Sequence, residues 1–146
     1  MTALEKTPTA LSRLTVALVL WSLSIGFAFP QQPQSDAEYV RSNYTKFEYR
    51  IPARDGVRLF TAVYIPNDRT QTYPILLFRT PYSVGPYGAD QYKETLGPNK
   101  RFDREGFIFA FQDVRGRYMS EGTFVDMTPH VAEKKSKQDV DESTDT

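Results

Sequence analysis

The stretch PILLFRTPYS (residues 74–83) decides the fold, because its apolar residues Ile75 to Phe78 follow one another without alternation. Such a run is typical of a strand that is covered on both faces. A second run of this kind, FIFAF (107–111), comes after residues 89–106, where we expect helix in two pieces, broken at Gly97-Pro98. A strand, a helical crossover and another buried strand form a βαβ unit, which predicts a parallel pair.

Upstream of this unit, residues 46–66 (KFEYRIPARDGVRLFTAVYIP) alternate apolar and polar side chains on both sides of Asp55-Gly56. Period-two alternation predicts strands, and an Asp-Gly pair favours a tight turn between antiparallel neighbours. The predicted fold class is therefore α/β, with an antiparallel hairpin followed by a parallel βαβ unit. We assign this folded domain to residues 46–125.

The composition excludes several classes of function. Lysine plus arginine and aspartate plus glutamate both number 18, so net charge gives no reason to expect a nucleic-acid partner or an anionic membrane surface. The chain has no cysteine and one histidine, which excludes a disulfide framework, a thiolate nucleophile and zinc sites built on cysteine. No spacing of histidines and carboxylates suggests a metal site.

The N-terminal residues 1–28 have the pattern of a secretory signal peptide. Lys6 and Arg13 precede the apolar run of residues 14–29, and Gly26 and Ala28 are the small residues before a plausible cleavage point. We expect an exported protein, periplasmic or extracellular, without a membrane association after cleavage. The alternative is a membrane anchor formed by residues 14–29. Residues 29–45, rich in glutamine, proline and serine, are expected to form a flexible arm.

Residues 126–146 are dominated by charge and are expected to form a polar loop or tail without a packing face of their own. They include His130, the only histidine. A histidine is the commonest general base in acyl transfer, but no neighbour in the sequence is expected to be buried enough to orient this ring. We therefore interpret His130 as a solvated loop residue.

In open α/β sheets, ligands bind beyond the carboxyl ends of the parallel strands, and the first candidate residue in this position is Tyr82. Pro81 restricts Thr80 to extended conformations, so Tyr82 leaves the strand in a defined direction. A tyrosine hydroxyl is a neutral donor that can stabilise the oxyanion of acyl transfer. The alternative from the residues alone is a ring that merely caps the sheet.

After the second buried strand, Asp113 and Arg115 flank Val114, and Gly116 allows a sharp turn. The simplest interpretation is an ion pair that ties down a loop and serves as scaffold near the site. Ser120 lies near Gly122, but the segment lacks the strand-turn-helix setting of a nucleophile elbow, so we do not assign it as a nucleophile.

Four stretches together carry a resemblance: IPARDGVRL (51–59), PILLFRTPYS (74–83), GFIFAFQDVRGRYMSEGTF (106–124) and DESTDT (141–146). In this order they resemble the N-terminal part of the family of X-Pro dipeptidyl-peptidases, cocaine esterases and α-amino-acid ester hydrolases. The resemblance covers residues 46–146, and within this family the chain is most similar to the ester hydrolase branch.

The resemblance implies the N-terminal part of an α/β-hydrolase sheet from a serine hydrolase that needs no cofactor and no metal. It implies that Tyr82 is the oxyanion-hole hydroxyl and that substrates are small esters, amides or X-Pro-type peptides. The family's Gly-x-Ser-Tyr-x-Gly nucleophile motif and its triad aspartate and histidine have no counterpart among these 146 residues.

Two expectations follow from this departure. The chain is the incomplete first part of such an enzyme and is inactive alone, and its fourth strand is expected to have a bare face and edge. The resemblance itself implies that relatives often form homo-oligomers. A rival from another class is a small exported binding module that uses the aromatic hairpin of residues 47–64 and catalyses nothing.

Overall fold

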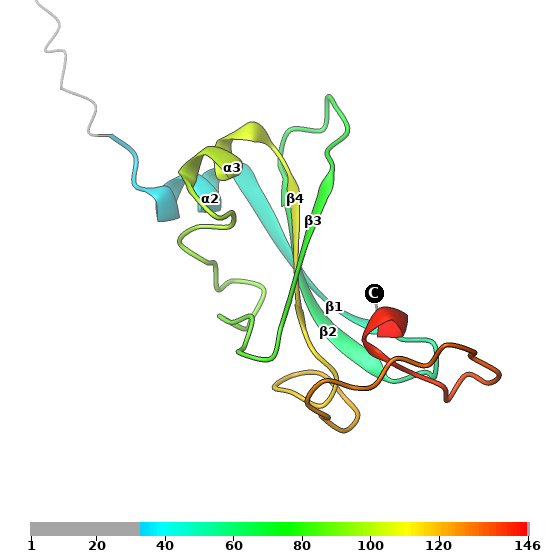
Figure 1. Cartoon of the computed structure of the whole chain (residues 1–146). Helices are drawn as coiled ribbons and strands as arrows, with labels where there is room; N and C mark the ends of the chain where they lie inside the picture. The colour runs from blue at the N-terminus through cyan, green and yellow to red at the C-terminus, as the bar shows by residue number, and fades with distance from the viewer. Residues whose placement is uncertain (1–32, 146) are drawn as a thin grey trace, which may run out of the picture. The chain divides into compact units, whose positions relative to one another are not determined.

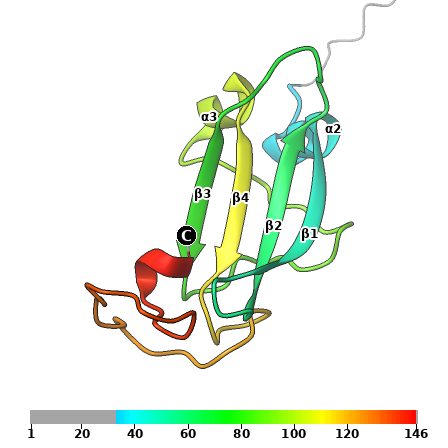
Figure 2. The same cartoon turned by 90° about the vertical axis from the view of Figure 1, so that its right-hand side faces the viewer.

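The computed structural model describes residues 33–145, and within them a four-stranded sheet is the central element. The element order is α2 (Asp36–Asn43), β1 (Tyr44–Pro52), β2 (Arg58–Pro66), β3 (Ile75–Thr80), α3 (Lys100–Glu105), β4 (Ile108–Asp113) and a short 3-10 helix (Glu142–Asp145). The strands lie in the order β1-β2-β4-β3 (Figure 2). The expected signal peptide, residues 1–28, lies outside the described residues. Among those described, no helix is long and apolar enough to span a membrane.

The predicted hairpin and the predicted parallel pair are both confirmed. β1 and β2 are antiparallel in a register that pairs Tyr44 with Pro66 and Pro52 with Arg58. Gly56 takes a φ of 90° in the connecting turn, a conformation that favours glycine. β3 and β4 are parallel, and β4 also pairs antiparallel with β2. The sheet is therefore mixed, as expected for an α/β protein whose chain enters through a hairpin.

One face of the sheet is covered by α2, α3 and the long connection after β3 (Figure 1). Alternate strand residues point to this side, because successive side chains of a strand face opposite ways. The cluster beneath the cover is aromatic and aliphatic, and its fully enclosed members include Tyr64, Phe109, Val84 and Val40. The connection after β3 packs in this layer, so the layer positions the residues that follow the carboxyl end of β3.

The prediction that β3 is covered on both faces is wrong. Leu76 and Phe78 pack against the core, but Ile75 and Leu77 are 65% and 44% exposed. β3 is also an edge strand, so the free edges belong to β1 and β3, and β4 is central rather than bare at its edge. The apolar run indicates that both faces of the strand are suited to burial. It does not indicate whether other parts of the described chain cover both faces.

The crossover between β3 and β4 contains less helix than predicted. Only α3, after the Gly97-Pro98 break, is helical, and residues 89–99 form turns and irregular backbone. The Nζ of Lys46 explains why, because it donates to the carbonyl oxygens of Pro86, Gly88 and Gln91 at 2.7–2.8 Å. A buried ammonium that takes three backbone carbonyls supplies the partners that a helix would otherwise give them.

Helix α2 lies inside the segment for which a flexible arm was expected. Its N-cap is Ser35, whose hydroxyl accepts from the N–H of Glu38, and Asp36 and Glu38 place negative charge in the first turn. Val40 is fully buried against the core. The capping pattern is readable in the sequence. Val40 docks the helix together with Tyr39, which packs against the core, and with Asp36, which forms an ion pair with Lys100 at 2.7 Å.

Candidate functional site

The carboxyl ends of β3 and β4 lie side by side, and the loops that follow them build the candidate site (Figure 2). Thr80, the last residue of β3, is in register with Asp113, the last residue of β4. The N–H of Val114 donates to the carbonyl of Thr80 at 3.3 Å, so the two chains remain joined as they leave the sheet. The turn of residues 81–84 and the loop of residues 114–122 are therefore neighbours.

Tyr82 sits in a turn whose backbone is held while its ring is free. Its N–H donates to the hydroxyl oxygen of Thr80 at 3.1 Å, and Ser83 takes a φ of 65°, which is unusual for a residue with a side chain. The Ser83 hydroxyl in turn accepts from the N–H of Gly85 at 3.2 Å. The Tyr82 ring is 81% exposed, and its hydroxyl makes no hydrogen bond within residues 33–145. The phenol is thus outside the packed interior, beyond the end of β3.

Asp113 holds the end of that turn from beneath. It is fully buried, and its Oδ1 accepts from the N–H of Val84 at 3.1 Å while its Oδ2 accepts from the hydroxyl of Tyr87 at 2.9 Å. Burial raises the pKa of Tyr87 above its ordinary value, and the hydrogen bond to the Asp113 carboxylate acts in the same direction. A neutral Tyr87 therefore remains a donor to Asp113 across the ordinary pH range.

The predicted ion pair between Asp113 and Arg115 is not formed. Arg115 pairs instead with Asp55 of the β1–β2 turn at 2.7 Å and with Asp145 at 2.6 Å. Hydrogen bonds from Arg115 lower the pKa of Asp55, and those with Asp145 and Asp55 raise the pKa of Arg115. Asp113 faces the covered interior, where amide and phenol groups satisfy it, and this leaves Arg115 to join the hairpin, the loop after β4 and the C-terminal segment.

Gly116 and Ser120 have structural roles in the loop after β4. Gly116 takes a φ of 67°, and a Cβ there would lie 2.1 Å from the backbone nitrogen of Phe124, so only glycine fits. The Ser120 hydroxyl donates to the carbonyl of Asp113 at 2.7 Å and accepts from the N–H of Phe60 at 2.8 Å. A hydroxyl engaged on both sides has a structural role in this loop.

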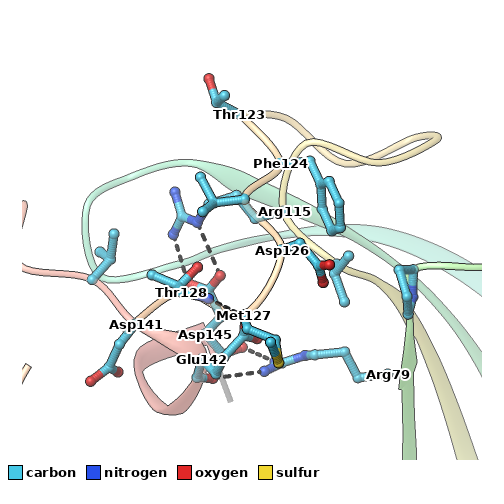
Figure 3. A pocket seen from close by; sticks show the side chains of 14 residues that line it. Arg79, Arg115, Thr123, Phe124, Asp126, Met127, Thr128, Asp141, Glu142 and Asp145 are labelled. Atoms are coloured by element: carbon cyan, nitrogen blue, oxygen red, sulfur yellow. Dashed lines mark hydrogen bonds and ion pairs between the residues drawn. The ribbon is translucent and has the colours of Figure 1, made fainter. Parts of the chain in front are cut away.

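A pocket of about 320 Å3 opens beside these loops, between the end of β3, the loop after β4 and the C-terminal segment (Figure 3). Pro81, Phe124 and Met127 give it apolar walls, and Arg79 and Arg115 lie at its charged side. Burial lowers the pKa of Arg79, whose guanidinium contacts Gln112 and the backbone of the C-terminal segment. Tyr82 itself is not among the lining residues, although the preceding Pro81 is.

The polar C-terminal segment is better anchored than expected. Asp141 is 4% exposed and accepts from the N–H of Val131, from Ser143 and from the Nζ of Lys134. These donors, led by the Val131 N–H, lower the pKa of Asp141. The segment buries little apolar surface, but its charges find partners, which the sequence pattern does not reveal.

His130 is exposed, as expected, and the buried carboxylate that approaches its ring comes from a residue that is distant in the sequence. The His130 side chain is 72% exposed, and its Nδ1 lies 3.1 Å from the Oδ2 of the buried Asp141. Across residues 33–145 no group of three or more histidine and carboxylate side chains could hold a metal ion.

The structure brings together some of the predicted residues and adds others. Asp113 contacts the turn that carries Tyr82, whereas Arg115 and Gly116 shape the neighbouring pocket wall. The sequence reasoning missed Asp55 and Asp145, the two partners of Arg115, which lie 60 and 30 residues away in the chain. No local signal in one sequence reports pairs so distant.

Comparison with known proteins agrees with this arrangement. The family description X-Pro dipeptidyl-peptidase (S15 family) matches residues 55–144. A cocaine esterase from Rhodococcus sp. (strain MB1 Bresler) is 38% identical over 89 residues, which is 61% of this chain and 14% of the esterase.

Two solved structures are also similar. An α-amino acid ester hydrolase has 31% identity and a TM-score of 0.57 over 84% of this chain, and an aminopeptidase from the marine sediment archaeon Thaumarchaeota archaeon has 32% identity and a TM-score of 0.56 over 81%. This chain spans 20% of each of those two chains. Its sheet, an antiparallel hairpin followed by a parallel pair, is an incomplete N-terminal part of the α/β-hydrolase fold.

Proposed function

Because the chain belongs to the X-Pro dipeptidyl-peptidase (S15) family of hydrolases, we propose that it is the N-terminal portion of an exported serine hydrolase in which Tyr82 donates its hydroxyl to the substrate oxyanion. The reaction class is acyl transfer to water from esters of α-amino acids or from X-Pro-type peptides. Asp113, Arg115 and Gly116 support the site and do not contact the reacting atoms.

The observation that carries the proposal is an exposed phenol on an anchored backbone. The Tyr82 ring is 81% exposed while the hydroxyl of Thr80 and the carboxylate of Asp113 hold the turn around it. A preorganised donor stabilises an oxyanion best, and here the structure fixes the backbone that carries the phenol while the exposed ring leaves its hydroxyl open to a substrate oxygen. A ring that merely caps the sheet would be packed against it instead.

The open face of the sheet supports the proposal that further polypeptide completes the enzyme. Parallel strands are ordinarily covered on both faces, yet Ile75 and Leu77 of β3 are exposed. No Gly-x-Ser-Tyr-x-Gly motif lies within these 146 residues. We therefore expect the 146-residue chain alone to show no serine-reagent-sensitive hydrolysis of phenylglycine methyl ester, and measurable turnover would contradict this part of the proposal.

A chimera tests the role of Tyr82. Residues 46–146 replace the aligned N-terminal segment of the solved α-amino acid ester hydrolase, and hydrolysis of phenylglycine methyl ester is measured. Tyr82→Phe is expected to lower kcat by about 10²–10³-fold with little change in KM, because the lost donor acts on charge that develops in the transition state. The matched control is Tyr118→Phe, another exposed tyrosine, at 58%, on the neighbouring loop. A folded chimera that is inactive, or one that tolerates Tyr82→Phe, would overturn the proposed role.

The proposed export is tested by the mature N-terminus. Secretion in a bacterial host followed by N-terminal sequencing is expected to give a chain that begins at Phe29, after cleavage behind Ala28. A secreted or membrane-bound product that retains residues 14–29 would favour the anchor instead.

A second candidate function is a small exported binding module. Phe47 and Tyr49 are exposed on β1, and their rings stack with centroids 6.2 Å apart, which resembles a recognition surface. The chimera separates the two functions, because a module that catalyses nothing would leave the folded chimera inactive, whereas a hydrolase portion would support turnover.

A further inference from the structure

The carboxylate of Asp113 is buried and forms no direct ion pair, although its charge acts on the pKa of the nearby Lys93. Asp113 is fully buried, and none of the ion pairs within the described part of the chain includes it. An isolated buried carboxylate is costly unless hydrogen-bond donors replace its lost water. Such a buried acceptor at the edge of a candidate site can hold the backbone and side-chain donors that converge on it.

The donors that satisfy Asp113 come from two different loops. From the turn after β3, the N–H of Val84 lies 3.1 Å from Oδ1 and the hydroxyl of Tyr87 lies 2.9 Å from Oδ2. From the loop after β4, the N–H of Met119 lies 3.4 Å from Oδ2. The Ser120 hydroxyl also donates to the Asp113 carbonyl at 2.7 Å. One residue thus joins the turn that carries Tyr82 to the loop that borders the pocket.

We propose that Asp113 is a positioning residue: its buried carboxylate fixes residues 82–87 relative to residues 117–120 and so sets where the Tyr82 hydroxyl lies. The coupling of the two loops is a property of this chain. Its consequence for catalysis rests on the proposed function of Tyr82. Ser83, with its φ of 65°, lies between Tyr82 and the anchored Val84, so loss of the anchor lets this turn relax.

The chain offers a matched control in Asp103, a second buried carboxylate. Asp103 is 3% exposed, and its Oδ1 accepts from the N–H groups of Leu96 and Gly97 at 3.0 and 2.7 Å. It has the same chemistry as Asp113 but holds a different loop. Asp103→Ala is therefore expected to loosen residues 96–97 and leave residues 82–87 unchanged.

Hydrogen exchange of the full 146-residue chain tests the coupling directly. Asp113→Ala is expected to speed amide exchange of residues 82–87 and 117–120 by about tenfold or more, while residues 61–64 of β2 keep their protection. Asp113→Asn keeps one carbonyl oxygen for the Val84 N–H and is expected to restore most of the protection. The proposal is overturned if protection falls equally in the sheet and the two loops, or if Asp103→Ala loosens the Tyr82 turn as much as Asp113→Ala does.

The chimera tests the catalytic consequence separately. Asp113→Ala is expected to lower kcat by about tenfold with KM unchanged, and Asp113→Asn, which keeps the acceptor for the Val84 N–H, is expected to restore most of the activity. Asp113→Ala added to Tyr82→Phe is expected to cause no further loss, because residues that act through one group are not additive. Additive losses would overturn the positioning role. If Tyr82→Phe alone had no effect, the proposed function would fail, whereas the exchange experiment would still decide the coupling.

Discussion

The two faces of the sheet contain similar side chains but differ in what covers them. On the covered face Tyr64 and Phe109 are fully buried. On the open face Ile75 and Leu77 of the edge strand β3 are 65% and 44% exposed, whereas Leu59 in the middle of the sheet is buried. Burial raises the pKa of Tyr64 to about 12. An apolar pattern therefore shows that a face of the sheet is suited to burial. Other contacts determine whether helices or loops pack on that face.

Those contacts are both apolar and polar. Val84 and Leu96 of the connection after β3 are buried in the core. Lys46 donates to three carbonyls of the same connection, and Lys93 donates to the carbonyl of Gly85 at 2.6 Å. Burial lowers the pKa of Lys93, with the nearby charge of Lys46 acting in the same direction. The open face is bordered instead by the C-terminal segment, which is held by ion pairs such as that of Arg115 with Asp145.

The largest expected effect is loss of a ring from the covered face. Phe109→Ala is expected to lower the free energy of unfolding by about 3–5 kcal/mol, because it leaves a cavity in a packed cluster. Urea unfolding of the full chain measures this change. Leu77→Ala on the open face is the control and is expected to cost less than about 1 kcal/mol. Equal losses at the two positions would break the contrast between the faces.

The next largest effect is expected when the hydrogen bonds from Lys46 to the connection after β3 are removed. Lys46→Met keeps the aliphatic stem but removes the charged donor, and it is expected to cost about 2–3 kcal/mol, since hydrogen bonds from a charged group are stronger than neutral ones. Amide exchange of residues 86–91 is expected to rise at the same time. Lys100→Met, whose side chain is 72% exposed, should change neither quantity. A neutral result for Lys46→Met would mean that apolar packing alone holds the cover.

A pH effect is expected at the C-terminal segment. The pKa of Asp141 is lowered in the folded chain, so its contribution to stability is fully present above the ordinary value of 3.8 and is lost as the pH falls through the folded-state pKa. Amide protection of residues 131 and 143–144 should therefore fall in acid before that of the sheet. Asp141→Asn is expected to remove this pH dependence, and Glu133→Gln, at an 80% exposed side chain, is expected to leave it unchanged. Acid sensitivity that survives Asp141→Asn would assign the effect to other carboxylates.

The smallest effect on stability, but the clearest on solubility, is expected on the open face. Leu77→Lys should change the free energy of unfolding by less than about 1 kcal/mol and reduce self-association of the chain, because exposed apolar patches and free strand edges promote it. Light scattering against concentration measures the change. Met127→Lys, at an 83% exposed apolar residue outside the sheet, is the control. If both substitutions reduced association alike, the open face would not be its source.

Much of the fold could be predicted because local chemistry encodes it. Alternation around Asp55-Gly56 predicted the hairpin, and the two apolar runs predicted the parallel pair of β3 and β4. The helix expected over residues 89–96 failed because Lys46, far away in the chain, takes the carbonyls that a helix would use. The prediction of an Asp113–Arg115 ion pair was wrong for a related reason, because each residue contacts partners that are distant in the sequence.

The candidate site was predictable only in outline. Pro81 and the strand before it predicted where Tyr82 leaves the sheet, but the anchoring of its turn by Asp113 needs two loops to meet. Arg115 likewise finds Asp55 and Asp145 only after the hairpin and the C-terminal segment approach the loop after β4. Separations of 60 and 30 residues leave no periodic trace in one sequence.

The sequence by itself determined the strands, the turn at Gly56, the parallel pair and the family likeness, because side-chain periodicity and backbone restriction act between close neighbours. The tertiary structure alone decided the strand order and which face of the sheet is covered. It also decided that Asp113 holds the turn that carries Tyr82 and that Lys46 holds the connection after β3. The physical reason is that hydrogen bonds and ion pairs are satisfied by whichever donor lies nearest in space, and only folding makes distant residues near.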